Sequence, residues 1–83
     1  MDKSQHKELS AREFEVLKLI ALGLMSKEVA HKLFISEKTV EKHRASGFQK
    51  LGVKSRMHLV HFALHNHWVE NIYSTNGNSW VAM

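Results

Sequence analysis

Apolar residues recur every three to four positions in four separate stretches of this chain, and a serine stands directly before each stretch. That spacing is typical of amphipathic helices, and a serine before the first helical turn accepts a hydrogen bond from one of its unpaired amides. Alternating apolar and polar residues, which would indicate strands, are scarce, and proline is absent. The pattern therefore predicts an all-α fold of four helices, which begin after Ser10, Ser26, Ser36 and Ser55.

Local signals set the ends of these helices. Glu13 lies three residues after Ser10, which predicts a capping box at the start of the first helix. Gly23 and Gly52 follow the first and third apolar stretches, and glycine readily adopts the left-handed conformation that ends helices. The third helix is therefore expected to span residues 37–51.

The aromatic residues are expected to serve packing rather than ligand binding. Phe34 and Ile35 stand in the short turn before the third helix, where they are expected to fill the core. Trp68 and Trp80 are interpreted as packing residues rather than as platforms on which bases stack. Phe14 lies off the apolar stripe of the first helix and is expected to be partly exposed.

The positive charge of the chain is concentrated in one stretch. Residues 27–56 contain eight basic and three acidic side chains, whereas the rest of the chain contains four basic and five acidic ones. The same stretch holds the second and third predicted helices, joined by a turn of about four residues, as in helix-turn-helix proteins. A compact positive helical surface favours binding to DNA, because neutralising phosphates supplies most of the affinity that does not depend on sequence.

Several other classes of function are disfavoured. The chain has no cysteine, which excludes disulfides and thiolate zinc sites and fits a cytoplasmic protein. No apolar run approaches the roughly 20 residues that a membrane span needs. Paired carboxylates, a nucleophile beside a base and a glycine-rich phosphate loop are all missing, so we expect neither an enzyme nor a cofactor.

The histidines raise the hypothesis of a metal site. His61 and His65 are four residues apart on one face of the fourth predicted helix, and His58 precedes them. Zinc sites use such spacing, but no cysteine is available and the nearest acid in sequence is Glu70. We therefore expect no metal, and we interpret these histidines as a titratable surface near an interface.

Three segments of the chain resemble the LuxR/NarL/FixJ-type (GerE-like) helix-turn-helix domain of bacterial transcription regulators: LSAREFEVLKLIALG, SKEVAHKLFISEKTVEKH and KLGVKSR. The resemblance implies a four-helix domain whose recognition helix, at 37–51, lies in the major groove of DNA, and whose fourth helix serves dimerisation. The domain organisation expected from it is an extension at 1–8, the DNA-binding domain at 9–70 and a flexible tail at 71–83. The expected partners are double-stranded DNA, a second copy of the chain and RNA polymerase.

The resemblance also implies roles for individual residues. Lysine can donate to guanine, glutamate can accept from cytosine, and an alanine methyl can touch the methyl group of thymine. The residues expected to read bases are Lys38, Glu41, Lys42 and Ala45. Those expected to contact phosphates are Lys27, Thr39, His43, Lys50 and Lys54. Separately from the resemblance, the spacing i, i+4 and i+7 on the fourth predicted helix places three residues on one line, which is expected to form a two-fold dimer contact: His58, Phe62 and His65.

Two residues depart from the family pattern and keep alternatives open. Gly47 stands where the family usually has a large aliphatic residue, so we expect a void in the core that Phe48 fills. Glu41 stands where many members carry a cation, and phosphate repels it unless a cytosine amine receives it. One alternative is a protein-interaction module that keeps the fold without reading DNA. The other is a promoter-recognition domain like that of a sigma factor, which would need RNA polymerase.

Overall fold

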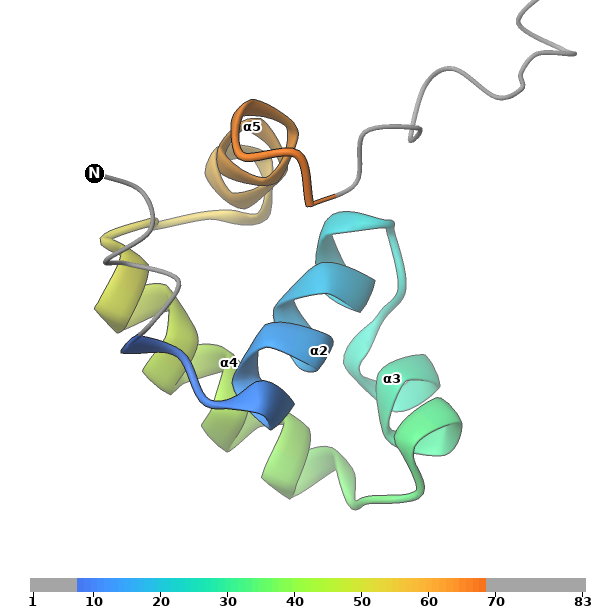
Figure 1. The fold of residues 1–83 in the computed structure, drawn as a ribbon. Helices are drawn as coiled ribbons and strands as arrows, with labels where there is room; N and C mark the ends of the chain where they lie inside the picture. Colours follow the sequence, from blue (N-terminus) through green and yellow to red (C-terminus); the bar gives the residue numbers. More distant parts are fainter. Residues whose placement is uncertain (1–7, 69–83) are drawn as a thin grey trace, which may run out of the picture.

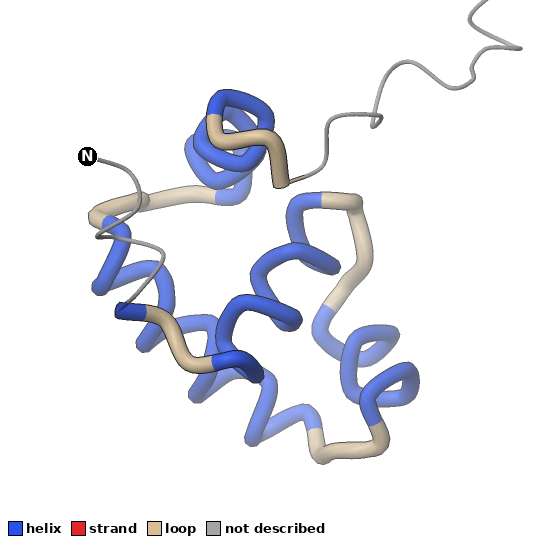
Figure 2. Tube along the Cα trace, viewed as in Figure 1, coloured by secondary structure: helices blue, strands red, loops and turns tan. Residues whose placement is uncertain are grey.

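The computed structural model describes residues 8–68, and within them it contains four helices and no strand (Figures 1 and 2). This arrangement confirms the predicted all-α, four-helix fold. Labelled as in Figure 1, the helices are α2 (Ala11–Ala21), α3 (Ser26–Leu33), α4 (Glu37–Leu51) and α5 (Arg56–His65).

The helices begin largely where their caps predict. Three of the four expected serine caps are confirmed, because each hydroxyl accepts a backbone N–H three residues later at 3.0–3.1 Å: Ser10, Ser36 and Ser55. The capping box of α2 is also complete, since the carboxylate of Glu13 accepts the Ser10 N–H at 3.0 Å. These bonds satisfy amides that have no partner inside the helix.

The start of α3 differs from the prediction. Ser26 is the first residue of the helix rather than its cap, which is Met25. The carboxylate of Glu28 accepts the Met25 N–H at 2.7 Å and so satisfies this amide from within the first turn. The serine hydroxyl is therefore available for a bond outside its own helix.

The helix ends are closed by residues in the left-handed conformation. Gly23 and Gly52, with φ values of 106° and 72°, confirm the predicted ends of α2 and α4. Phe34 and His67 follow α3 and α5 with φ values of 60° and 61°. An L-amino acid side chain in this conformation costs roughly 1–2 kcal/mol, a cost that glycine avoids.

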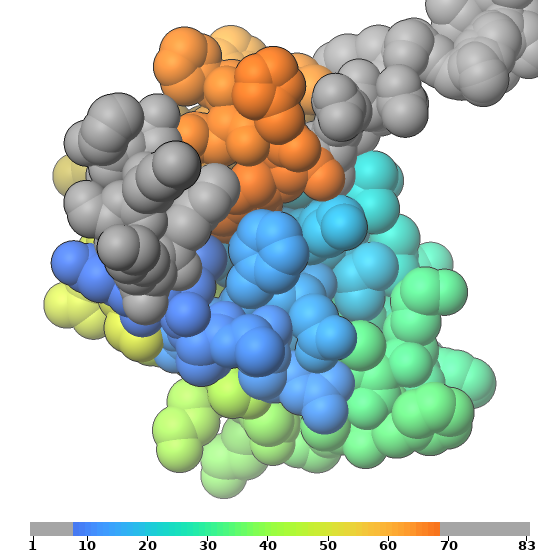
Figure 3. Space-filling view, viewed as in Figure 1, coloured from blue at the N-terminus to red at the C-terminus, as the bar shows by residue number. Residues whose placement is uncertain are grey.

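The core is organised around α2, which packs against α3, α4 and α5 (Figure 1). Figure 3 shows α5, in orange, covering the upper end of α2. All four helices contribute to the core centre, whose largest fully buried side chains are Val16, Leu17, Val29, Val40 and Leu59. The core therefore leaves the outer side of α4 free for another task.

The prediction of a void at Gly47 was wrong. A Cβ atom placed on this buried glycine would lie 2.6 Å from Cδ1 of Leu17. The Leu17 side chain thus occupies the space that a side chain on residue 47 would need, and α2 lies close against the backbone of α4. Phe48, which was expected to fill a void, instead packs half-buried at the edge of the core.

The turn between α3 and α4 also differs from the prediction. Ile35 packs against the core as expected. Phe34 was expected to do the same, but its side chain points into solvent and is 92% exposed. The left-handed conformation of Phe34 turns the chain so that only its neighbour faces inward.

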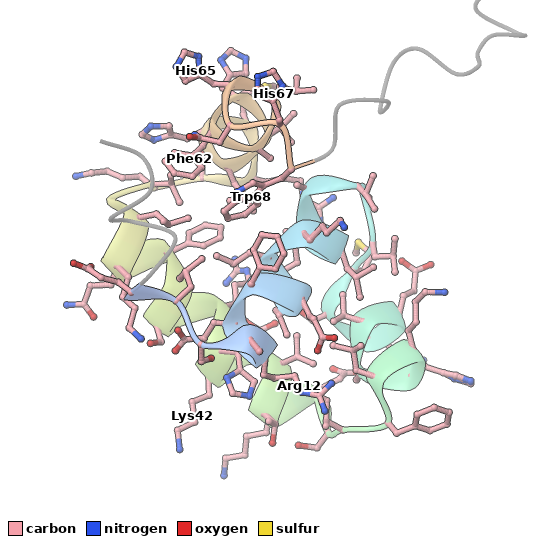
Figure 4. All side chains as sticks on the ribbon, in the orientation of Figure 1. Arg12, Lys42, Phe62, His65, His67 and Trp68 are labelled. Carbon is pink, nitrogen blue, oxygen red and sulfur yellow. The ribbon has the colours of Figure 1, made fainter. Side chains whose placement is uncertain are left out.

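An aromatic cluster joins α5 to α2. Trp68, which is 7% exposed, is confirmed as a packing residue. Its ring meets those of Phe14 and Phe62 edge to face, at centroid distances of 4.8 and 5.4 Å. Figure 4 labels Phe62 and Trp68 of this cluster. Phe14 is partly buried by this contact. Trp80, the other tryptophan expected to pack, lies outside the described residues.

Candidate nucleic-acid interface

The outer face of α4 is a straight line of exposed side chains. Lys38, Lys42 and Ala45 are all exposed and follow one another at intervals of four and three residues. This spacing places them on one face of a helix, opposite the buried residues of α4, which are Val40, Gly47 and Leu51. Figure 4 shows Lys42 extending away from the bundle. The structure therefore brings together three of the four side chains expected to read bases.

Gln49 extends this line by one more turn and was missed in the sequence analysis. It is exposed and lies four residues after Ala45. The helical spacing alone could have identified it. A glutamine amide can donate to and accept from a base edge, most readily that of adenine.

Glu41, the fourth residue expected to read bases, lies beside this line and is held by neighbours. Its carboxylate accepts the Ser26 hydroxyl from the start of α3 and an N–H of Arg44 at 3.2 Å. The Glu41 side chain is still 51% exposed. Its negative charge is therefore partly compensated, and its position is fixed at the junction of α3 and α4.

Lys50, expected to contact phosphate, has a structural role that was not anticipated. Its ammonium group donates to the carboxylate of Glu13 at 2.8 Å and to the backbone oxygen of Glu8 at 3.1 Å. An ammonium has three N–H donors, so these two bonds leave one. Lys50 thus joins α4 to the N-terminal end of α2, while its side chain stays 37% exposed.

Glu13 is the buried acid at this junction. Only 7% of the residue is exposed, and its carboxylate also accepts the Ser46 hydroxyl at 2.8 Å. The pKa of Glu13 falls from 4.5 to about 2, chiefly because Lys50 donates to the carboxylate. The Ser10 amide and the Ser46 hydroxyl add to this lowering, whereas burial opposes it. Glu13 lies on the apolar stripe of its helix, and that position was the signal that could have revealed its burial.

The N-terminal end of α4 is suited to bind an anion. Ser36 caps the helix and also donates from its hydroxyl to that of Thr39 at 2.9 Å. Thr39 is half-buried, and Lys38 beside it is exposed. Helix N-termini carry a partial positive charge, which favours a phosphate at this end.

Further basic groups lie at both ends of α4. Lys27, in the first turn of α3, lines a surface depression with Glu37 and Glu41 at the start of α4. Lys54 follows the other end of α4, and its backbone N–H donates to Nδ1 of His58 at 3.3 Å. Both lysine side chains are exposed, whereas His43 on α4 is half-buried.

The two arginines of the basic stretch are occupied within the domain. Arg44 pairs with Glu41 and lies over the ring of Phe48, at 5.1 Å from its centroid. Arg56 donates to the backbone oxygen of Leu24 at 2.9 Å and so ties α5 to the loop after α2. Within residues 8–68, five exposed lysine side chains of α3, α4 and the following loop form neither a hydrogen bond nor an ion pair: Lys27, Lys32, Lys38, Lys42 and Lys54.

The line expected to form a dimer contact is only partly exposed. His58 and His65 are exposed, but Phe62 is half-buried against Trp68. A groove on α5 is lined by His58, Phe62 and His65, and Figure 4 labels the last two of these. Within residues 8–68, no three histidine or acidic side chains lie close enough to hold a metal ion.

Comparison with known proteins identifies relatives of this domain. Residues 7–63 match the family described as bacterial regulatory proteins, luxR family. The oxygen regulatory protein NreC of Staphylococcus aureus strain JH9 is 55% identical over 56 residues, and the same values hold for NreC of strains JH1 and Mu3. The match covers 68% of this chain but 26% of NreC, so the chain spans about a quarter of the length of these relatives. Among the described helices, none is long and apolar enough to cross a membrane.

Proposed function

Because this chain belongs to the LuxR family of bacterial regulatory proteins, whose members bind DNA, we propose that it regulates transcription by reading a specific double-stranded sequence in the cytoplasm. In this proposal α4 lies in the major groove. The observation that carries it is the exposed line of Lys38, Lys42 and Ala45, directly opposite the buried side of the same helix. The major groove is about 12 Å wide and admits one helix.

The side chains on this line differ in what they can read. Lys38 and Lys42 donate to the O6 and N7 atoms of guanine, and the methyl of Ala45 contacts the methyl group of thymine. Glu41 accepts from the amino group of cytosine with the lone pairs that Ser26 and Arg44 leave open. Because its carboxylate is held in place, Glu41 restricts the sequence more than it raises affinity.

Phosphate contacts fix the helix in the groove. Lys27 and Lys54, at opposite ends of α4, grip the strands on either side, and the Thr39 hydroxyl reaches a phosphate at the helix start. His43, at the side of α4, contacts a further phosphate, and Lys50 donates its one remaining N–H to another. These contacts carry no sequence information, so they contribute equally on every duplex.

The proposal extends to the assembly. The domain, at 9–70, pairs with a second copy through the α5 groove, so that two copies of α4 reach half-sites about 34–36 Å apart. Residues 1–8 and 71–83 lie outside this unit. RNA polymerase is the proposed further partner of the bound dimer.

The test compares Lys42→Ala with Lys18→Ala, which removes an exposed lysine from α2 instead. Duplexes that the chain prefers are first selected from a random pool, and affinity is then measured on these and on random duplexes over a range of salt concentrations. Lys42→Ala should cost about 1–3 kcal/mol on the preferred duplex and less on random DNA. Lys18→Ala should change neither affinity.

The salt series decides between DNA binding and the alternative of a protein-interaction module. A DNA-binding domain shows log K falling steeply with log salt, because bound phosphates release counterions. If the unaltered chain shows no such dependence, the proposed function is wrong. If Lys42→Ala and Lys18→Ala behave alike on both duplexes, DNA binding stands but the role of α4 does not.

A further inference from the structure

Phe34 is the feature of this domain that the fold and the proposed contacts leave unexplained. Its side chain is 92% exposed, more than the other exposed large apolar residues of the described chain, Leu22, Met25 and Met57. Single exposed apolar residues are common on protein surfaces. Phe34 differs because it is also held in an unfavourable backbone conformation.

The conformation of Phe34 is one that its side chain disfavours. Its φ of 60° is left-handed, and at the ends of α2 and α4 the same conformation is adopted by Gly23 and Gly52. The turn needs this conformation, because it lets the Ile35 N–H reach the backbone oxygen of Ala30 at 3.1 Å. A glycine or asparagine would satisfy the turn with less strain. Strained residues of this kind cluster at functional sites.

The side chain of Phe34 makes no packing contact in the core that would compensate for this strain. Ile35 is the residue of this turn that packs against the core. A benzene ring cannot form a hydrogen-bonding cap, and this one is almost entirely in solvent. A contact made outside this fold would explain why phenylalanine stands here.

The place of Phe34 indicates what that contact is. It lies two residues before Ser36, which caps α4, and four before Lys38, the first lysine of the exposed line. In Figure 1 this turn lies at the lower edge of the molecule and α5 at the upper edge, so Phe34 is remote from the surface proposed for dimerisation. The exposed Lys32 and Lys38 flank it along the chain.

We propose that Phe34 is a DNA contact residue, whose ring packs against deoxyribose at the edge of the groove where α4 enters. This inference rests on the proposed function. Deoxyribose presents an apolar carbon surface between charged phosphates, and a ring laid on it removes water from both apolar surfaces. The neighbouring lysines hold the phosphates on either side. The contact involves no charge and no base edge, so it adds affinity without adding specificity or salt dependence.

The experiment replaces Phe34 with asparagine, which tolerates the left-handed conformation, and measures binding and unfolding of the whole chain. Phe34→Asn should bind both preferred and random duplexes about tenfold more weakly, with the slope of log K against log salt unchanged. Its urea unfolding midpoint should be equal to or higher than that of the unaltered chain. Phe34→Tyr keeps an aromatic ring and should bind as tightly as the unaltered chain. Leu22→Asn removes an exposed apolar side chain elsewhere and should not lower the affinity.

The outcomes separate this inference from the proposed function. If the unaltered chain binds duplex with a steep salt dependence and Phe34→Asn binds equally well, the inference is overturned and the function stands. If the unaltered chain shows no salt-dependent binding, the function fails, and the inference fails with it. A lower unfolding midpoint for Phe34→Asn would show a role in folding instead, which also overturns the inference.

Discussion

Individual residues in this domain often serve two purposes, and Glu13 is the clearest example. It completes the capping box of α2 and also accepts Lys50 and Ser46 of α4. Its folded pKa of about 2 lies below the ordinary value of 4.5. A carboxyl whose pKa is lowered by folding contributes stability that is present above pH 4.5 and is lost as the pH falls toward 2.

Replacing Glu13 with glutamine should therefore remove a pH-dependent part of the stability. At pH 7 we expect Glu13→Gln to lower the free energy of unfolding by about 2 kcal/mol, less than the full pKa shift implies because Lys50 is partly solvated. Roughly half of this difference should be gone at pH 3. Urea unfolding at both pH values measures it. Glu15→Gln, in an exposed ion pair with Arg12, is the matched control and should show almost no difference at either pH.

At the scale of whole helices, local signals were enough to predict α4 to the residue, over 37–51. Ser36 and Gly52 mark the two ends of this helix by their residue types alone, and the helical spacing predicts the line of exposed side chains. The start of α3 was misplaced because its cap bond comes from Glu28, inside the helix. Phe34 was misjudged because periodicity does not reveal backbone dihedral angles.

The contacts between helices were the part that the sequence could not predict. A void at Gly47 follows from its missing side chain only if α2 keeps its usual distance, and here Leu17 fills the space. Likewise, the positive charge of residues 27–56 was visible in the sequence, but the pairing of Lys50 with Glu13 is a contact between residues 37 positions apart. Tertiary packing therefore decided which of the basic residues face outward.

The close contact of α2 with α4 can be tested through Gly47. Alanine would gain roughly 1 kcal/mol in helix propensity but would overpack against Leu17, at a cost of about 1–3 kcal/mol. We expect Gly47→Ala to destabilise the domain by about 1 kcal/mol in urea unfolding. In a double-mutant cycle, Leu17→Val shortens the opposing side chain, so its combination with Gly47→Ala should cost less than the sum of the two. If the destabilisations of Gly47→Ala and Leu17→Val simply add, residue 47 does not contact Leu17 in the way described.

At the scale of the whole molecule, two surfaces lie on different sides of the bundle. The exposed line of α4 is turned toward DNA in our proposal, and the α5 groove is turned toward a second copy. A small domain buries a limited core, so self-association would also add to its stability. Both surfaces can act at once because they lie on different helices, each of which packs against α2.

The α5 surface gives a prediction about assembly. His65→Asp places like charges on facing helices of a two-fold pair. It should weaken self-association at least tenfold in sedimentation experiments at pH 7.5. His31→Asp changes an exposed histidine on α3 and should leave self-association unchanged. Equal behaviour of the two variants would place the dimer contact elsewhere.

Amide chemical-shift mapping shows directly whether α4 enters the groove of DNA. The chain is titrated with its preferred duplex, and the shift of each backbone amide is followed. We predict that the largest changes fall on residues 38–45, with smaller ones at Lys27 and Lys54. If the amide shifts of residues 38–45 do not change while the duplex binds elsewhere, α4 does not enter the groove.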